Sequence, residues 1–206
     1  MENSIAKQIE NYKSIFSNSV PQVAPKFKKS LGSELDIRAK ISASYELVVE
    51  RYGGHIIMDQ TTSNSLSAVT SWIYDDPHRW LLLYGSLGNG KTTMLWALSA
   101  IVYPSILISA QNIFDYFRKN EVLPEIPDSN VLLIDDLGIE PLQCKLFGED
   151  RVPLAELLAK RYSSRATTVI ATNLSIDDIQ ARYGDRVADR MAEVATAVLY
   201  DAPSYR

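Results

Sequence analysis

Gly85-Ser86-Leu87-Gly88-Asn89-Gly90-Lys91-Thr92-Thr93 is the stretch of the sequence that decides the fold. It fits the pattern GxxxxGK[ST], in which a glycine-rich turn joins a β-strand to an α-helix and surrounds phosphate oxygens. An apolar run, Trp80–Tyr84, precedes the turn, and a helix-forming run, Met94–Ile101, follows it. The glycines let backbone N–H groups point at the phosphates, and the helix N-terminus adds partial positive charge. We therefore predict that these nine residues bind a nucleotide.

Two side chains of this loop have specific expected roles. Lys91 should bridge the β- and γ-phosphates of ATP, and the Thr92 hydroxyl should coordinate Mg²⁺. The alternative is a glycine-rich turn with an exposed lysine, and the flanking strand and helix argue against it. ATP and Mg²⁺ are thus the expected ligands.

The chain after Pro77 alternates short apolar runs with helical stretches, which indicates a parallel sheet covered by helices on both faces. The expected strands are 80–84, 105–109, 130–135, 167–172 and 195–200, and the expected helices between them are 91–103, 110–119, 153–163 and 175–183. Ligands bind at the carboxyl ends of such strands, where the polar motifs fall. The prediction is an α/β fold, a P-loop NTPase core with a parallel five-stranded sheet.

Two acidic residues end the apolar run Val131-Leu-Leu-Ile-Asp135-Asp136. Asp135 would come to the carboxyl end of a buried strand beside the phosphate loop, where it could hold Mg²⁺ through water. Asp136 could polarise the attacking water as a general base, and Glu140 is a reserve candidate for that role. An acidic turn after a strand is the alternative interpretation.

Asn173 ends the next apolar run, Thr167–Thr172. Its amide could hydrogen-bond the lytic water or the γ-phosphate. An asparagine before Ser175 is also typical of a turn or helix cap, so the interpretation depends on its place after the neighbouring strand.

Three arginines, Arg182, Arg186 and Arg190, recur at four-residue spacing. On one helix they would share a face. Asp185 and Asp189 lie between them, so a salt-bridged surface helix is one interpretation. The other is an arginine finger, a guanidinium presented to the γ-phosphate of a neighbouring subunit.

The composition is that of an ordinary globular protein: 206 residues, 46% hydrophobic and 22% charged, with a net charge of −4. Cys144 is the only cysteine, which excludes an internal disulfide and a multi-cysteine zinc site. We expect a cytoplasmic protein without a membrane interaction, because no apolar run is long enough to span a bilayer and the first residues lack the apolar core of a signal peptide.

The first part of the chain differs from the rest in charge. Residues 1–40 carry seven cations and four anions, and residues 41–206 carry fourteen and twenty-one. Ile5, Ile9, Tyr12 and Phe16 predict a short amphipathic helix over residues 4–16, either packed on its own domain or offered to a partner. We expect residues 1–41 to form an N-terminal extension with this helix and a linker, and residues 42–206 to form the ATPase domain.

From about Ser42 to Arg206 the sequence resembles the AAA+ ATPases of the DnaC/IstB-like group, which are bacterial helicase loaders and transposition-helper ATPases. The resemblance rests on GSLGNGKTT, VLLIDDLGIE, LLAKRYSSRATTVIATNLS and YGDRVADRM in the family's order, and on the ending YDAPSYR. It implies an AAA+ core without the C-terminal helical lid. The implied matches are Lys91 and Thr92 for Walker A, Asp135 and Asp136 for Walker B, Asn173 for sensor 1, and Arg190 for the arginine finger, with Arg186 as its alternative.

The resemblance also implies a function. The expected protein is a slow ATPase of DNA replication, stimulated by DNA or a partner, that assembles as a homo-oligomer when nucleotide is bound. Its client would be a replicative helicase or a transposase, and it would bind single-stranded or double-stranded DNA. Two alternatives stay open: a P-loop kinase of small molecules, and a nucleotide switch that barely hydrolyses ATP, since Asp136 stands where many ATPases have glutamate.

Overall fold

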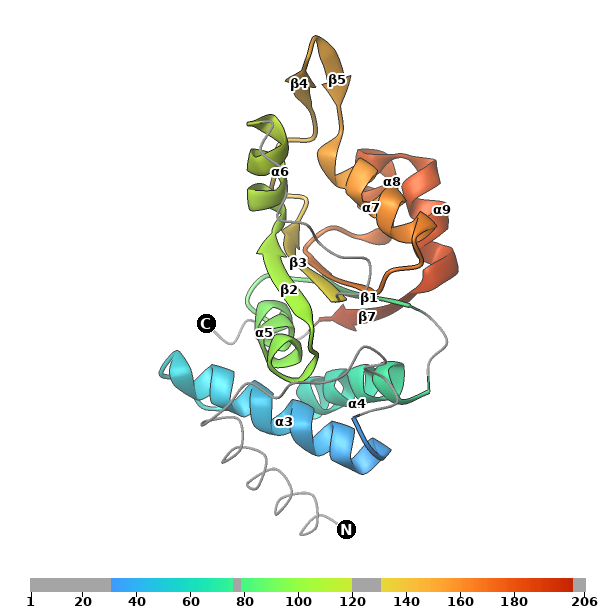
Figure 1. The fold of residues 1–206 in the computed structure, drawn as a ribbon. Helices are drawn as coiled ribbons and strands as arrows, with labels where there is room; N and C mark the ends of the chain where they lie inside the picture. The colour runs from blue at the N-terminus through green and yellow to red at the C-terminus, as the bar shows by residue number, and fades with distance from the viewer. Residues whose placement is uncertain (1–30, 76–78, 120–130, 202–206) are drawn as a thin grey trace.

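The computed structural model describes residues 31–75, 79–119 and 131–201 (Figure 1). The helix expected over residues 4–16 lies outside them. The central element is a five-stranded sheet in the order β2-β3-β6-β1-β7, and every neighbouring pair is parallel. Its strands are β1 (Trp80–Gly85), β2 (Ser105–Ser109), β3 (Val131–Leu137), β6 (Thr168–Thr172) and β7 (Ala195–Tyr200). All five expected strands are therefore confirmed.

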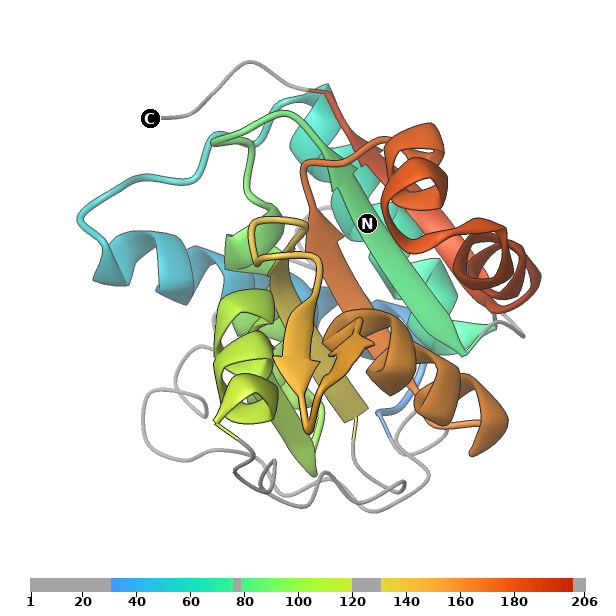
Figure 2. The same cartoon turned by 90° about the horizontal axis from the view of Figure 1, so that it is seen from above.

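Helices cover both faces of this sheet, as the alternating pattern predicted (Figures 1 and 2). The helices are α3 (Glu34–Arg51), α4 (Gln60–Tyr74), α5 (Lys91–Ile101), α6 (Ala110–Arg118), α7 (Pro153–Ser163), α8 (Ile176–Tyr183) and α9 (Asp185–Val194). The first three pack on one face and the other four on the opposite face. Alternate side chains of β1 point to opposite faces of the sheet. Leu81 and Leu83 pack against α3–α5, and Trp80 and Leu82 pack against α6–α9.

Helix α3 crosses the expected boundary between residues 41 and 42 without a break. Its start is set by a capping box, in which Ser33 Oγ accepts from the N–H of Asp36 and the Asp36 carboxylate accepts from the N–H of Ser33. Ile37 and Ile41 are fully buried in the core layer that contains α5. The described residues before position 42 therefore pack in the same core layer as α5 and the sheet, and we propose that any extension ends before them.

A small antiparallel hairpin, β4 (Cys144–Leu146) and β5 (Glu149–Arg151), interrupts the connection from β3 to α7 and was not predicted. It projects away from the sheet (Figure 1). The base of the hairpin is anchored, because Cys144 is buried and both Arg151 Nε and Nη2 donate to the Glu156 carboxylate. Phe147, at its tip, is 84% exposed.

None of the helices within the described ranges is both long and apolar enough to cross a membrane.

The packing of α3 predicts the effect of one substitution. Ile37→Ala should lower the free energy of unfolding by about 2–5 kcal/mol, because Ile37 is fully buried. Leu35→Ala on the same helix is the matched control and should cost less than about 1 kcal/mol, since Leu35 is 45% exposed. Urea denaturation of the full chain measures both. Equal, small losses would show that the first turns of α3 do not belong to the core.

Candidate nucleotide-binding site

The phosphate loop leaves β1 in a conformation that requires glycine at two points. Gly85 and Gly90 have φ angles of 131° and 95°, which L side chains rarely adopt. A Cβ atom on Gly85 would lie 2.1 Å from the carbonyl oxygen of Tyr200, and one on Gly90 would lie 2.2 Å from the hydroxyl oxygen of Tyr45. The loop is therefore packed tightly against β7 and α3.

The end of β7 also holds the loop by hydrogen bonds. The Tyr200 carbonyl accepts from the backbone N–H of Ser86 at 3.2 Å and from the side-chain amide of Asn89. Asn89 is 3% exposed, so its amide is fixed between the strand and the loop. Residues far apart in the sequence thereby shape one phosphate cradle.

Lys91 lies folded over this cradle. Its Nζ donates to the carbonyl oxygen of Gly85 at 2.9 Å, to that of Ser86, and to Asn89 Oδ1 at 3.1 Å. Burial lowers the pKa of Lys91, and the charges of Asp136 and Asp135 oppose that shift. An ammonium held by three loop acceptors is placed where an incoming phosphate can replace some of them.

Thr92 and Asp135 meet at the carboxyl edge of the sheet, as predicted for a Mg²⁺ site. Thr92 Oγ1 donates to Asp135 Oδ1 at 3.1 Å. Burial raises the pKa of Asp135, and the neighbouring Asp136 raises it further. The described residues contain no group of three or more His, Cys, Asp or Glu side chains that could hold a metal ion. A hydroxyl and one carboxylate suit Mg²⁺, which keeps several waters and binds substrate phosphates.

A bulge in β3 explains how two consecutive aspartates can both lie beside the phosphate loop. Successive residues of a regular strand point to opposite faces. Here the register between β3 and β6 shifts between Ile134 and Leu137, and Asp136 has a φ of 53°. Asp136 thus lines the pocket while Asp135 bonds Thr92. Aspartate is one of the few non-glycine residues that tolerate this left-handed conformation.

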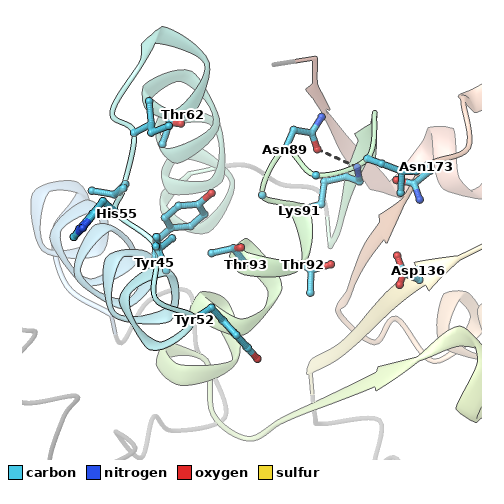
Figure 3. Close-up of a pocket in the computed structure, with 17 residues that line it drawn as sticks. Tyr45, Tyr52, His55, Thr62, Asn89, Lys91, Thr92, Thr93, Asp136 and Asn173 are labelled. Atoms are coloured by element: carbon cyan, nitrogen blue, oxygen red, sulfur yellow. Dashed lines mark hydrogen bonds between the residues drawn. The ribbon is translucent and has the colours of Figure 1, made fainter. Parts of the chain in front are cut away.

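Asn173 directly follows β6, the strand between β3 and β1, and lines the same pocket. The turn is tied to the acidic segment, because Thr172 Oγ1 donates to the Leu137 carbonyl at 2.6 Å. The structure therefore brings Asn173, Asp136 and Lys91 to one place, as the order of motifs predicted (Figure 3).

The pocket has a second half that the sequence analysis did not assign. The cavity measures about 430 Å³, within the range of small-molecule sites. Its phosphate end is lined by the loop from Leu87 to Thr93, and its other end by Tyr45, Val49, Tyr52, Gly54, His55, Ile56, Ile57 and Thr62 (Figure 3). This end comes from α3, the segment after it and the start of α4. The pair Gly53-Gly54 between the two helices indicates a turn in the sequence, not a ligand site.

Glu140, the reserve candidate for the general base, does not line the pocket. Its side chain is 2% exposed, and both carboxylate oxygens are engaged. The backbone N–H of Gly138 donates to Oε2 at 2.8 Å, and the Tyr183 hydroxyl donates to Oε1. Arg182 Nη2 lies 3.5 Å from Oε1 and also donates to the Glu140 carbonyl. Glu140 therefore attaches the turn that contains Asp136 to the end of α8.

The three arginines do not share one helix face, contrary to the expectation from their spacing. Arg182 is on α8, whereas Arg186 and Arg190 are on α9, and Gly184 with a φ of 87° separates the helices. Arg186 is exposed, and the Arg190 guanidinium lies 4.9 Å from the ring centre of Tyr162. Among the described residues neither forms an ion pair, so the salt-bridged helix is not observed.

These contacts predict that two nearby carboxylates behave differently when neutralised. Glu140→Gln should lower the free energy of unfolding by about 2–3 kcal/mol, because a buried acceptor of charged and neutral donors is lost. Asp136→Asn should leave stability nearly unchanged, since Asp136 faces the open pocket. Thermal unfolding of both variants, each beside an ATP-binding titration, makes the comparison. Equal stability of the two variants would contradict the anchoring role of Glu140.

No protein-family model matches the sequence, and no curated protein matches it. Solved structures do match the fold. DnaI superposes with a TM-score of 0.56 at 18% identity, over 73% of this chain and 87% of that chain. AMPPCP-bound DnaA from Aquifex aeolicus superposes with a TM-score of 0.52 at 19% identity, over 70% of this chain and 48% of that one. DnaA bound to AMPPCP and single-stranded DNA matches equally well, with a TM-score of 0.52.

The chain spans about half of the DnaA structures that it matches and most of the DnaI structure. These similarities, at below 20% identity, concern the fold. They agree with the resemblance of the motifs to the DnaC/IstB-like group. The described part of this chain has an α/β P-loop fold, a five-stranded parallel sheet with helices on both faces, and this fold is similar to those of DnaI and DnaA.

Proposed function

We propose that this protein binds and hydrolyses ATP and acts as a DnaC-like AAA+ factor in DNA replication. One observation carries the proposal: a single cavity joins the phosphate loop, an acidic residue and an asparagine to a half lined by aromatic and aliphatic side chains. The phosphate end suits a triphosphate, and the other end suits a purine base.

The residues in and beside the pocket have separate proposed roles in hydrolysis. The loop N–H groups and Lys91 bind and orient the β- and γ-phosphates. Thr92 and Asp135 would hold Mg²⁺, which neutralises phosphate charge when bound. Asp136 accepts a proton from the water that attacks the γ-phosphorus, and Asn173 orients that water. As the water oxygen bonds to the γ-phosphorus, the bond on its opposite side, to the oxygen of ADP, breaks and ADP leaves.

Arg190 is proposed to complete this site from a second copy of the chain. It lies on α9 and does not line its own pocket. A guanidinium supplied by a neighbouring subunit stabilises the negative charge of the transition state. Hydrolysis then depends on assembly, so nucleotide state and oligomeric state are coupled.

The structural neighbours support a role in DNA replication. DnaI and DnaA match the fold, and one DnaA structure contains both AMPPCP and single-stranded DNA. We propose a cytoplasmic factor that binds DNA and loads or remodels a protein client, for which a replicative helicase is the first candidate and a transposase the second. A small-molecule kinase and a nucleotide switch that barely hydrolyses ATP are the remaining alternatives.

Phosphate release under multiple turnover tests the proposal. The full chain should release phosphate from Mg-ATP without any added acceptor, and the rate per subunit should rise with protein concentration or with single-stranded DNA. Lys91→Ala is the control without a competent phosphate loop. ATP binding without turnover would favour the switch, and transfer to a small acceptor would identify a kinase.

Mixing two inactive variants tests whether Arg190 acts between subunits. Arg190→Ala retains its own pocket, and Lys91→Ala retains its own Arg190. If the arginine is supplied by a neighbour, each variant alone should lose at least about a hundredfold in rate, and an equimolar mixture should regain a measurable fraction. Two variants that stay inactive when mixed, while still assembling, would contradict a finger supplied in trans.

A further inference from the structure

Tyr162 connects α7 to α9 by two separate contacts. Its ring centre lies 4.9 Å from Cζ of Arg190, and its hydroxyl donates to Glu193 Oε2. That hydrogen bond raises the pKa of the Tyr162 hydroxyl, so the group stays protonated and remains a donor at neutral pH. One side chain thus contacts the proposed finger with its ring and a nearby carboxylate with its hydroxyl.

Glu193 is the residue that would otherwise pair with Arg190. It follows Arg190 by three positions on α9, and side chains at this spacing are neighbours on a helix surface. In the structure, however, the carboxylate accepts from Tyr162. No carboxylate of the described residues lies within ion-pair distance of the Arg190 guanidinium. The helix carries the components of an ion pair, and in the structure both of them contact Tyr162 instead.

We propose that Tyr162 is a positioning residue that keeps Arg190 available to the γ-phosphate of a second copy by occupying Glu193 and supporting the guanidinium on its ring. The inference rests on the proposed role of Arg190 between subunits. This role of Tyr162 is distinct from packing, because its hydroxyl binds the Glu193 carboxylate, which would otherwise be free to pair with Arg190.

The chemistry of the two contacts explains why this arrangement suits an arginine finger. A cation–π contact at a partly exposed site orients a guanidinium but leaves its charge unneutralised and its N–H donors free. An ion pair with Glu193 would occupy those donors and weaken the attraction to a phosphate. The Arg79 guanidinium, 6.0 Å from the same ring centre, adds a second positive charge to this surface. Two guanidiniums therefore lie near one tyrosine ring, whose hydroxyl contacts the carboxylate of Glu193.

Tyr162→Phe separates the two contributions, because it keeps the ring and removes the hydroxyl. We expect kcat for ATP to fall about threefold, as released Glu193 pairs with Arg190 in an exposed ion pair of ordinary strength. The KM for ATP should stay unchanged, since the nucleotide pocket of the same subunit is intact. Tyr162→Ala should lose more, about tenfold, because the aromatic support is lost as well.

Rescue by a second substitution distinguishes this role from a structural one. Glu193→Gln alone should resemble wild type, and Tyr162→Phe combined with Glu193→Gln should restore kcat, because the neutral amide cannot form the ion pair. Tyr74→Phe, an exposed tyrosine on α4, is the matched control and should have no effect. Thermal unfolding of every variant checks the fold.

Three outcomes overturn the inference, and they do so differently. A Tyr162→Phe variant with wild-type kcat, beside an inactive Arg190→Ala, refutes the role of Tyr162 and leaves the proposed finger standing. A loss in Tyr162→Phe that Glu193→Gln does not rescue shows a structural role. An Arg190→Ala variant with full activity refutes the finger, and this inference falls with it.

Discussion

The close contact between the end of β7 and the phosphate loop is the constraint on which the rest of the site depends. Gly85 pairs with Tyr200 in the parallel register of β1 and β7, and the Tyr200 carbonyl accepts from both Ser86 and Asn89. Because a Cβ atom on Gly85 would lie 2.1 Å from the Tyr200 carbonyl oxygen, only glycine allows the loop to leave β1 this close to β7. Asn89 in turn accepts from Lys91, so the position of the Lys91 ammonium depends on the same contact.

The strand that holds the loop is also the continuation of the helix that carries the proposed finger. Helix α9 ends at Val194 and β7 begins at Ala195. On the other side of β1, the Glu140 anchor ties the acidic turn to the end of α8, directly before α9. The nucleotide pocket and the arginine-bearing surface are thus joined through β7 and through Glu140.

The sequence predicted the sheet and the phosphate end of the site because both depend on local patterns. Apolar runs place the five strands, and GxxxxGK[ST] with the acidic and asparagine residues places Lys91, Asp136 and Asn173 at their carboxyl ends. What it could not show depends on tertiary contacts. The bulge that turns Asp136 toward the pocket and the burial of Glu140 arise from partners far along the chain. The base-facing half of the pocket likewise has no motif, because apolar and aromatic contacts to a ring require shape rather than a fixed residue order.

The most direct test of the account is a structure of the full chain bound to Mg²⁺ and a non-hydrolysable ATP analogue. We expect the triphosphate on the loop from Gly85 to Thr93 and the base between this loop and the segment after α3. The Arg190 guanidinium of a second copy should lie within hydrogen-bond distance of the γ-phosphate. A nucleotide bound elsewhere would contradict the assigned pocket. A γ-phosphate contacted by a single copy of the chain in the assembled state would contradict the finger.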